Sequence, residues 1–199
     1  MFNKNKTYEQ HDNEKISFYR NSVEDLNSQD YLLADINVDI CVIGGGLTGI
    51  STALNLSKKG YSVVLCEARK IGWGASGRNG GQLGIGMRKD QYTVEKMLGL
   101  SHAKELWKLG LESVDEVKTL IKEYNINCHL VNGIMSSACF PKDIDEFKFE
   151  LEYMSKNYNS DGYKFFNSSE IKNEINSDTY LAGLLDTYSY HLNPLKLTI

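Results

Sequence analysis

The chain has 199 residues, with 41% hydrophobic residues, 24% charged residues and a net charge of −4. This balance is typical of a folded globular protein and argues against a disordered chain or a nucleic-acid partner. Residues 1–30 form a polar lead-in without the apolar core of a signal peptide, and no run reaches the length of a membrane span. We therefore expect no membrane partner and a cytoplasmic protein, in which the four scattered cysteines are free thiols.

The first predicted element is a strand at 39–43, an apolar run rich in β-branched residues that ends at glycine. Such a run is typical of a buried parallel strand. The next residues, GGGLTG at 44–49, match the pattern G-x-G-x-x-G. In this pattern Gly44 takes a tight turn, Gly46 lets a pyrophosphate approach the backbone, and Gly49 lets the next helix pack closely on the strand.

A helix follows the fingerprint and is expected to end at Gly60, and a second strand at 61–66 ends at Glu67. Phosphates would lie at the N-terminus of this helix, near Leu47 and Thr48, where free N–H groups and the helix dipole favour negative charge. The Glu67 carboxylate is placed to accept hydrogen bonds from a ribose diol and would repel a 2′-phosphate, which disfavours NADP. The alternative is a doubly wound protein whose first turn binds nothing.

A second glycine-rich segment, residues 71–82, follows directly and contains five glycines among twelve residues. Such a segment can run along an extended cofactor and offer it backbone N–H groups, which favours FAD over NAD. Arg78 could offset phosphate charge or lie near the flavin ring. A flexible surface loop with a solvated arginine is the alternative. The predicted cofactor-binding residues are Gly44, Gly46, Leu47, Thr48, Gly49, Glu67, Ala68, Arg69, Ser76, Arg78, Asn79, Gly80 and Gly81.

The later elements follow from apolar periodicity, capping residues and turn signals. We expect a helix over 91–124 with a break near 99–101, a hairpin over 128–140 that turns at Asn132-Gly133, a helix over 141–158, a strand over 163–166, a helix capped by Ser168-Ser169, an extended segment or strand pair over 180–190, and a helix that begins at Asn193-Pro194. Neither a catalytic residue nor a metal site is predicted. His191 follows several tyrosines and could line an amine pocket, but a structural histidine is the favoured interpretation.

The run from Asp39 to Gln82 resembles the amino-terminal FAD-binding segment of the D-amino-acid oxidase-like (glycine/sarcosine oxidase) family. Within that family, EARKIGWGASGRNGGQ is most similar to the gamma-glutamylputrescine oxidoreductases. The segment LAGLLD at 181–186, followed by HLNP at 191–194, resembles a later strand and turn of the family. There the chain departs from the family pattern at Tyr190 and Asn193, which weakens the inference about substrate.

This resemblance implies an α/β fold, in which an FAD-binding Rossmann-like βαβ parallel sheet is joined by part of an interleaved mixed-sheet substrate domain. It implies a partial oxidoreductase domain over 31–199, with the dinucleotide-binding unit and its loop at 39–82 and part of a substrate domain at 125–190. It also implies oxidation of a C–N bond in a small amine or amino acid, with hydride transfer to FAD.

Members of this family are about twice as long, and the chain stops about one turn into the helix that begins at Asn193. We therefore expect a truncated, split or fragmentary protein. One alternative to an active oxidoreductase is a non-catalytic remnant or half-protein that needs a partner chain, such as the missing carboxy-terminal half. Another is an NAD-binding Rossmann module.

Overall fold

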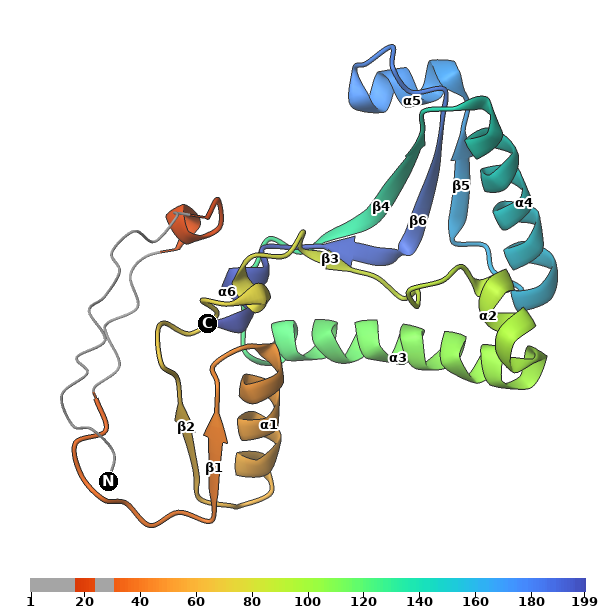
Figure 1. Ribbon diagram of the computed structural model, residues 1–199. Coiled ribbons are helices and arrows are strands. Elements are labelled where there is room, and N and C mark those ends of the chain that lie inside the picture. Colours follow the sequence, from red (N-terminus) through yellow and green to blue (C-terminus); the bar gives the residue numbers. More distant parts are fainter. Residues whose placement is uncertain (1–16, 24–30) are drawn as a thin grey trace. The chain divides into compact units, whose positions relative to one another are not determined.

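The computed structural model describes residues 17–23 and 31–199 (Figure 1). Residues 1–16 and 24–30, which hold most of the predicted polar lead-in, lie outside the described residues. A short 3-10 turn, η1, spans Arg20–Ser22. The chain divides into two compact units, residues 1–78 and residues 79–199, and each is described by itself.

The first unit contains the predicted strand–helix–strand sequence. Strands β1 (Ile40–Ile43) and β2 (Val63–Cys66) pair in parallel, with Ile40 opposite Val63, and helix α1 (Leu47–Lys58) packs against both. Gly60 follows the helix with a φ of +89°, a left-handed conformation that glycine adopts at little cost. The parallel connection through a helix confirms the predicted βαβ unit.

Strand β1 is more exposed than the sequence predicts. Its burial alternates, the Cys41 side chain is exposed, and Ile43 retains 87% of its accessible surface. Within the described residues of this unit, one helix packs on a sheet of two strands. Apolar side chains of β1 that do not face this helix are uncovered by other described residues, so the prediction of a buried strand at 39–43 is wrong here.

The second unit is built on an antiparallel sheet centred on β6 (Ala182–His191). Strand β4 (Val131–Ala138) pairs along β6, while β5 (Tyr163–Phe166) and β3 (Gln82–Leu83) pair with different parts of it. Figure 1 shows α4 (Pro141–Tyr158) alongside this sheet and α5 (Ser168–Ile175) at one end of it. The parallel unit and the antiparallel sheet together form the mixed α/β architecture that the sequence predicts.

The helices of the second unit begin and end close to their predicted positions. The expected break divides the long helical region into α2 (Gln91–Leu98) and α3 (Leu100–Glu123), because Gly99 has a φ of +81°. Asn193 caps α6 (Pro194–Thr198) by accepting a hydrogen bond from the Lys196 N–H, as predicted. The cap of α5 lies one residue earlier than predicted, since the Asn167 side chain accepts from the N–H groups of Ser169 and Glu170.

The predicted hairpin over 128–140 is wrong. The segment contains a single strand, β4, whose register against β6 shifts between Asn132 and Ile134. Gly133 has a φ of +98° at this shift, so the Asn-Gly pair forms a bulge within a strand instead of a turn. The Asn132 amide donates to the Thr187 carbonyl oxygen (2.7 Å), which ties the bulge to the partner strand. The 180–190 segment is likewise one strand, long enough to pair with three others.

The core of the second unit lies between the sheet and its helices. Its most buried apolar residues are Ala103, Cys128, Ala138, Met154, Ile171 and Ala182, each at most 1% exposed.

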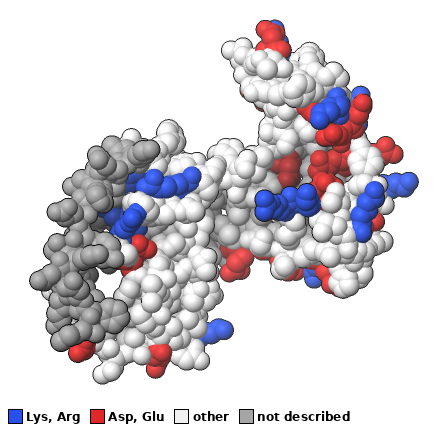
Figure 2. Space-filling view, viewed as in Figure 1, with Lys and Arg blue, Asp and Glu red and all other residues white. Residues whose placement is uncertain are grey.

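In the face shown in Figure 2, basic and acidic side chains are interspersed over the described surface and no basic stripe is visible. Among the described residues, no helix combines the length and hydropathy that crossing a bilayer would require.

Candidate cofactor and ligand sites

The fingerprint turn joins β1 to α1 through two glycines that have separate roles. Gly44 has a φ of +107°, a conformation that glycine adopts most readily. A Cβ on Gly49 would lie 1.9 Å from the Gly44 carbonyl oxygen, so only glycine allows the helix to approach the turn this closely. Both roles agree with those expected from the sequence pattern.

The N-terminus of α1 is covered by the second glycine-rich loop. Gly46 is the N-cap residue and has no side chain to satisfy the first N–H groups of the helix. The Ser76 hydroxyl oxygen, which lies in the short 3-10 turn η2 (Ala75–Gly77), accepts a hydrogen bond from the Leu47 N–H (2.9 Å). A Cβ on Gly46 would lie 2.8 Å from the same oxygen. Ser76 therefore packs directly against the turn where phosphate binding is expected.

Glu67 lies at the end of β2, and its carboxylate is oriented by two backbone donors. Oε2 accepts from the Gly45 N–H (2.6 Å), and Oε1 accepts from the Arg69 N–H (2.9 Å). The Gly72 N–H donates to the Gly45 carbonyl oxygen (2.8 Å), so the loop is also tied to the fingerprint. The structure thus brings the acid, the fingerprint and the loop together, as a dinucleotide site requires.

Trp73 contacts two arginines, one just before the glycine-rich loop and one within it, and the sequence interpretation did not single it out. The Arg69 guanidinium carbon lies 3.5 Å from the centroid of the Trp73 ring, and that of Arg78 lies 4.7 Å away. Arg78 Nε also donates to the Trp73 carbonyl oxygen (2.6 Å). The sequence does contain a signal for this cluster: a tryptophan among small residues, with arginines four residues before it and five residues after it.

The last three predicted cofactor-binding residues belong to the second unit. The Gly81 N–H donates to Asn79 Oδ1 (2.8 Å), and the Gly81 carbonyl oxygen accepts from the Leu192 N–H (2.8 Å). Gly81 has a φ of +69°, and a Cβ on it would lie 2.1 Å from the Leu192 carbonyl oxygen. Gly80 is exposed, and a Cβ on it would meet nothing within 4 Å. Gly81 is thus fixed by local packing, while Gly80 presents open backbone.

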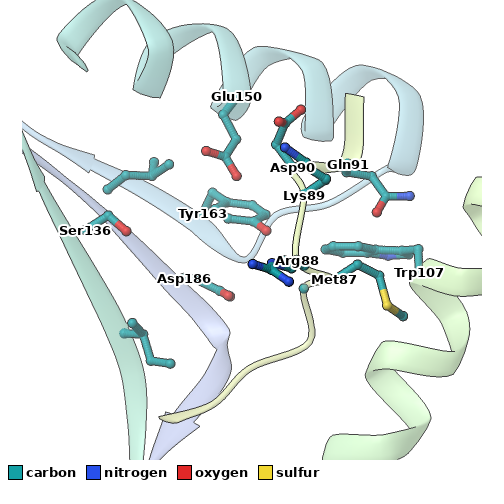
Figure 3. Close-up of a pocket in the computed structure, with 13 residues that line it drawn as sticks. Met87, Arg88, Lys89, Asp90, Gln91, Trp107, Ser136, Glu150, Tyr163 and Asp186 are labelled. Atoms are coloured by element: carbon teal, nitrogen blue, oxygen red, sulfur yellow. The ribbon is translucent and has the colours of Figure 1, made fainter. Parts of the chain in front are cut away.

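A cavity of about 270 Å³ lies within the second unit. Figure 3 shows Glu150 reaching from α4 towards Tyr163 on β5, with Asp186 on β6 and Arg88 on the loop before α2. Trp107, on α3, lines another side of the cavity. Carboxylates and aromatic rings suit an ammonium group, and an arginine suits a carboxylate, so the lining fits a small amphoteric ligand. Sequence reasoning did not find this cavity because its lining comes from many separate elements.

Two groups of the cavity are perturbed by burial. Burial raises the pKa of Glu150, and the neighbouring carboxylates of Asp90 and Asp186 raise it further. Burial also raises the pKa of Tyr163, with a further contribution from Asp186. Asp186 itself accepts from the Ser189 hydroxyl (2.5 Å), whereas Glu150 has no hydrogen-bond partner in the described ranges. Glu150 is therefore the carboxyl group that a cationic ligand would stabilise most.

His191, the one histidine considered for an amine pocket, makes a structural contact. Its Nδ1 lies 3.0 Å from the carbonyl oxygen of Gly133, at the bulge of β4. His102 is exposed on α3. Among residues 17–23 and 31–199, no group of three or more potential metal-ligating side chains comes together.

The sequence model of the DAO family, described as FAD dependent oxidoreductase, matches residues 39–199. The chain belongs to this family. The match includes both the fingerprint unit and the antiparallel sheet, and it agrees with the resemblance carried by residues 39–82.

Curated relatives of this DAO-family chain are longer than the chain itself. It is 36% identical to gamma-glutamylputrescine oxidoreductase of Escherichia coli strain K12, over 92% of its own length and 43% of the relative. It is 34% identical to a probable oxidoreductase, OrdL, of Haemophilus influenzae, over 86% of its length and 41% of that protein. The chain therefore spans about two fifths of the curated relatives it matches.

Solved structures show the same fold at lower identity. Glycine oxidase from Bacillus cereus matches with a TM-score of 0.58 at 17% identity, over 81% of this chain and 43% of that one. L-amino acid deaminase from Proteus vulgaris matches with a TM-score of 0.59 at 21% identity, over 83% of this chain and 36% of that one. These likenesses confirm the predicted fold class for the DAO-family chain.

The residues of the first unit fit the adenosine diphosphate part of FAD. The helix N-terminus has backbone donors, the missing Cβ of Gly46 makes room for the Ser76 hydroxyl, and Glu67 presents a carboxylate whose remaining lone pairs can accept hydrogen bonds from ribose hydroxyls. Arg69, two residues before the glycine-rich loop, and Arg78, within it, supply positive charge. Nothing in this donor set conflicts with a bound dinucleotide.

Proposed function

We propose that this chain is the FAD-binding part of an oxidoreductase that oxidises the C–N bond of a small amine or amino acid. One observation carries the proposal. The second glycine-rich loop is hydrogen-bonded to the fingerprint at two points, Gly72 to Gly45 and Ser76 to Leu47. This arrangement extends a βαβ unit into the kind of open, donor-rich surface that suits a cofactor longer than NAD.

In this proposal the predicted residues contact different parts of FAD. The turn glycines and Glu67 bind the adenosine end, while the α1 N-terminus and Ser76 bind the pyrophosphate. Residues 76–81 would lie nearer the pyrophosphate and the flavin ring. Bound FAD would supply the hydride acceptor for amine oxidation. The full proposed set remains Gly44, Gly46, Leu47, Thr48, Gly49, Glu67, Ala68, Arg69, Ser76, Arg78, Asn79, Gly80 and Gly81.

The proposed substrate class is an amine of the gamma-glutamylputrescine type. The 36% identity to the Escherichia coli enzyme supports this choice. The sheet over 125–190 would then be part of the substrate domain. The cavity beside it, with Glu150 and Asp186 among its lining residues, suits a small cationic or amphoteric molecule.

A half-protein that needs a partner chain is the second candidate. The chain spans about two fifths of the curated relatives it matches. A carboxy-terminal half would be the partner.

The free cysteines Cys41, Cys66, Cys128 and Cys139 suit a reducing compartment, and we propose that this protein is located in the cytoplasm.

The proposal is tested by purifying the chain, recording its visible spectrum and titrating it with FAD and with NADH. We expect quenching of flavin fluorescence by the chain and at least tenfold tighter binding of FAD than of NADH. Glu67→Ala should weaken FAD binding, whereas Glu146→Ala, an exposed change on α4, should not. Binding of NADH without binding of flavin would instead identify an NAD module.

Catalysis requires a separate measurement. Amine-dependent bleaching of bound flavin by the chain alone would support an active oxidoreductase. Bleaching that requires addition of the carboxy-terminal part of a relative would support the half-protein. The reading frame next to the gene provides an independent check, since a neighbouring frame that encodes the missing half would identify a split protein.

A further inference from the structure

Trp73 contacts two of the four arginines in the whole sequence. The Arg69 guanidinium lies 3.5 Å from the centre of its ring, and the Arg78 guanidinium lies 4.7 Å from it. The Arg78 Nε–H also donates to the Trp73 carbonyl oxygen, which fixes that side chain at two points. Trp73 is half-buried, whereas both arginines are exposed. The indole therefore holds two cations whose remaining N–H groups are available to solvent.

These two cations have no opposing carboxylate in the part of the chain that the structure describes. The Glu67 carboxylate accepts from the backbone N–H of Arg69 and of Gly45, and forms no ion pair with either guanidinium. Two positive groups beside one ring repel each other, and the negative face of the indole only partly offsets this repulsion. An anion bound near these guanidiniums would offset their positive charge and form charge-assisted hydrogen bonds with them.

Trp73 also lies between the two points where the loop is tied to the fingerprint. On one side of it, the Gly72 N–H donates to the Gly45 carbonyl oxygen (2.8 Å). On the other side, Ser76 accepts from the Leu47 N–H (2.9 Å) at the start of α1. The indole is therefore held close to the turn where phosphates are expected, because the chain on both sides of it is hydrogen-bonded to that turn.

We propose that Trp73 is a positioning residue that holds Arg69 and Arg78 as a paired cation site for the phosphates of a dinucleotide, an inference that rests on the proposed binding of FAD. A free arginine loses side-chain entropy when it binds an anion. Stacking on the indole removes part of that loss before the ligand arrives. Trp73 thereby acts through the arginines and needs no contact with the cofactor.

A fluorescence titration tests this site without flavin. The chain has two tryptophans, so Trp107→Phe leaves Trp73 as the only indole emitter. We expect inorganic pyrophosphate and ADP to change the Trp73 emission, and adenosine to leave it unchanged. In the same background, Arg69→Gln and Arg78→Gln should each weaken pyrophosphate binding about tenfold. An unchanged emission at saturating pyrophosphate and ADP would overturn the paired site.

A second titration measures the effect on FAD itself. Trp73→Ala should raise the FAD dissociation constant about tenfold, or ~1.4 kcal/mol, and should flatten its dependence on salt concentration. Trp73→Phe should restore most of the affinity, because phenylalanine retains an aromatic face. Lys96→Gln serves as the matched control. It removes a cation 4.2 Å from the Tyr92 ring in the other unit and should leave FAD binding unchanged.

The outcomes separate the role of Trp73 from the proposed function. If FAD binds but Trp73→Ala retains native affinity and native salt dependence, the positioning role is refuted and FAD binding stands. If pyrophosphate binds through both arginines but FAD does not bind, the paired site stands and the proposed function is refuted. If neither ligand binds, both are refuted.

Discussion

The close approach of α1 to the fingerprint turn predicts a large effect of adding a single methyl group. In Gly49→Ala, the new Cβ would lie 1.9 Å from the Gly44 carbonyl oxygen. Nine in ten real Cβ contacts are longer than 3.4 Å, so the helix and the turn must separate by about 1.5 Å. Because the obstructing atom belongs to the backbone, no side-chain rotation relieves the contact.

The expected free-energy change combines two opposing terms. Replacing glycine by alanine within a helix gains up to about 1 kcal/mol from helix propensity. Forcing extra volume into a packed contact costs about 1–3 kcal/mol. We expect a net destabilisation of about 1–2 kcal/mol. The same displacement moves the first N–H groups of α1 away from Ser76, so FAD affinity should also fall about tenfold or more.

Thermal unfolding and FAD titration measure these two effects together. Gly74→Ala is the matched control, because a Cβ at that position in the same unit would meet nothing within 4 Å. The control should keep both native stability and native affinity. A Gly49→Ala protein that unfolds at the native temperature and binds FAD with native affinity would refute the packing argument.

Three further predictions concern other positions. Gly81→Ala places a Cβ 2.1 Å from a backbone carbonyl oxygen, at a residue whose φ is +69°. Urea unfolding should show that this change destabilises the second unit by about 2 kcal/mol. Gly84→Ala is the control and should be tolerated, because the nearest atom to its Cβ would be 3.7 Å away. Ser76→Ala removes the partner of a helix N–H and should cost about 1 kcal/mol of FAD binding in a fluorescence titration. Burial raises the pKa of Glu150 in the folded state above the ordinary value of 4.5. This residue therefore lowers the free energy of unfolding as the pH rises from 4.5 through the raised pKa. Glu150→Gln should therefore stabilise the protein at pH 8 and lose that advantage at pH 4, while the exposed Glu146→Gln should show neither effect.

The sequence predicted the fingerprint unit well because each of its steps is local. A strand, a turn that needs glycine at positive φ, and a helix follow one another within about twenty residues, and each has its own residue preference. The break between α2 and α3 was predicted for the same reason, since Gly99 adopts a conformation that few residues tolerate.

Predictions that depended on distant partners were less accurate. The Asn132-Gly133 pair has the chemistry of a hairpin turn, but pairing with β6 on both sides of it makes it a bulge. Burial of β1 depends on what covers its second face, which no local pattern reveals. The arginine pair on Trp73 was missed because periodicity and motif spacing do not show which side chains stack on one another.

The two backbone donors to Glu67 have a consequence for the usual conservative replacement of this residue. Its Oε2 accepts from Gly45 and its Oε1 from Arg69, so both carboxylate oxygens are needed as acceptors. A glutamine at this position offers one acceptor oxygen, and in either orientation its NH₂ group would face a backbone N–H. The carboxylate proposed to bind the ribose therefore also holds the loop in place through two hydrogen bonds. Replacing Glu67 by glutamine would disturb the loop even without a bound cofactor.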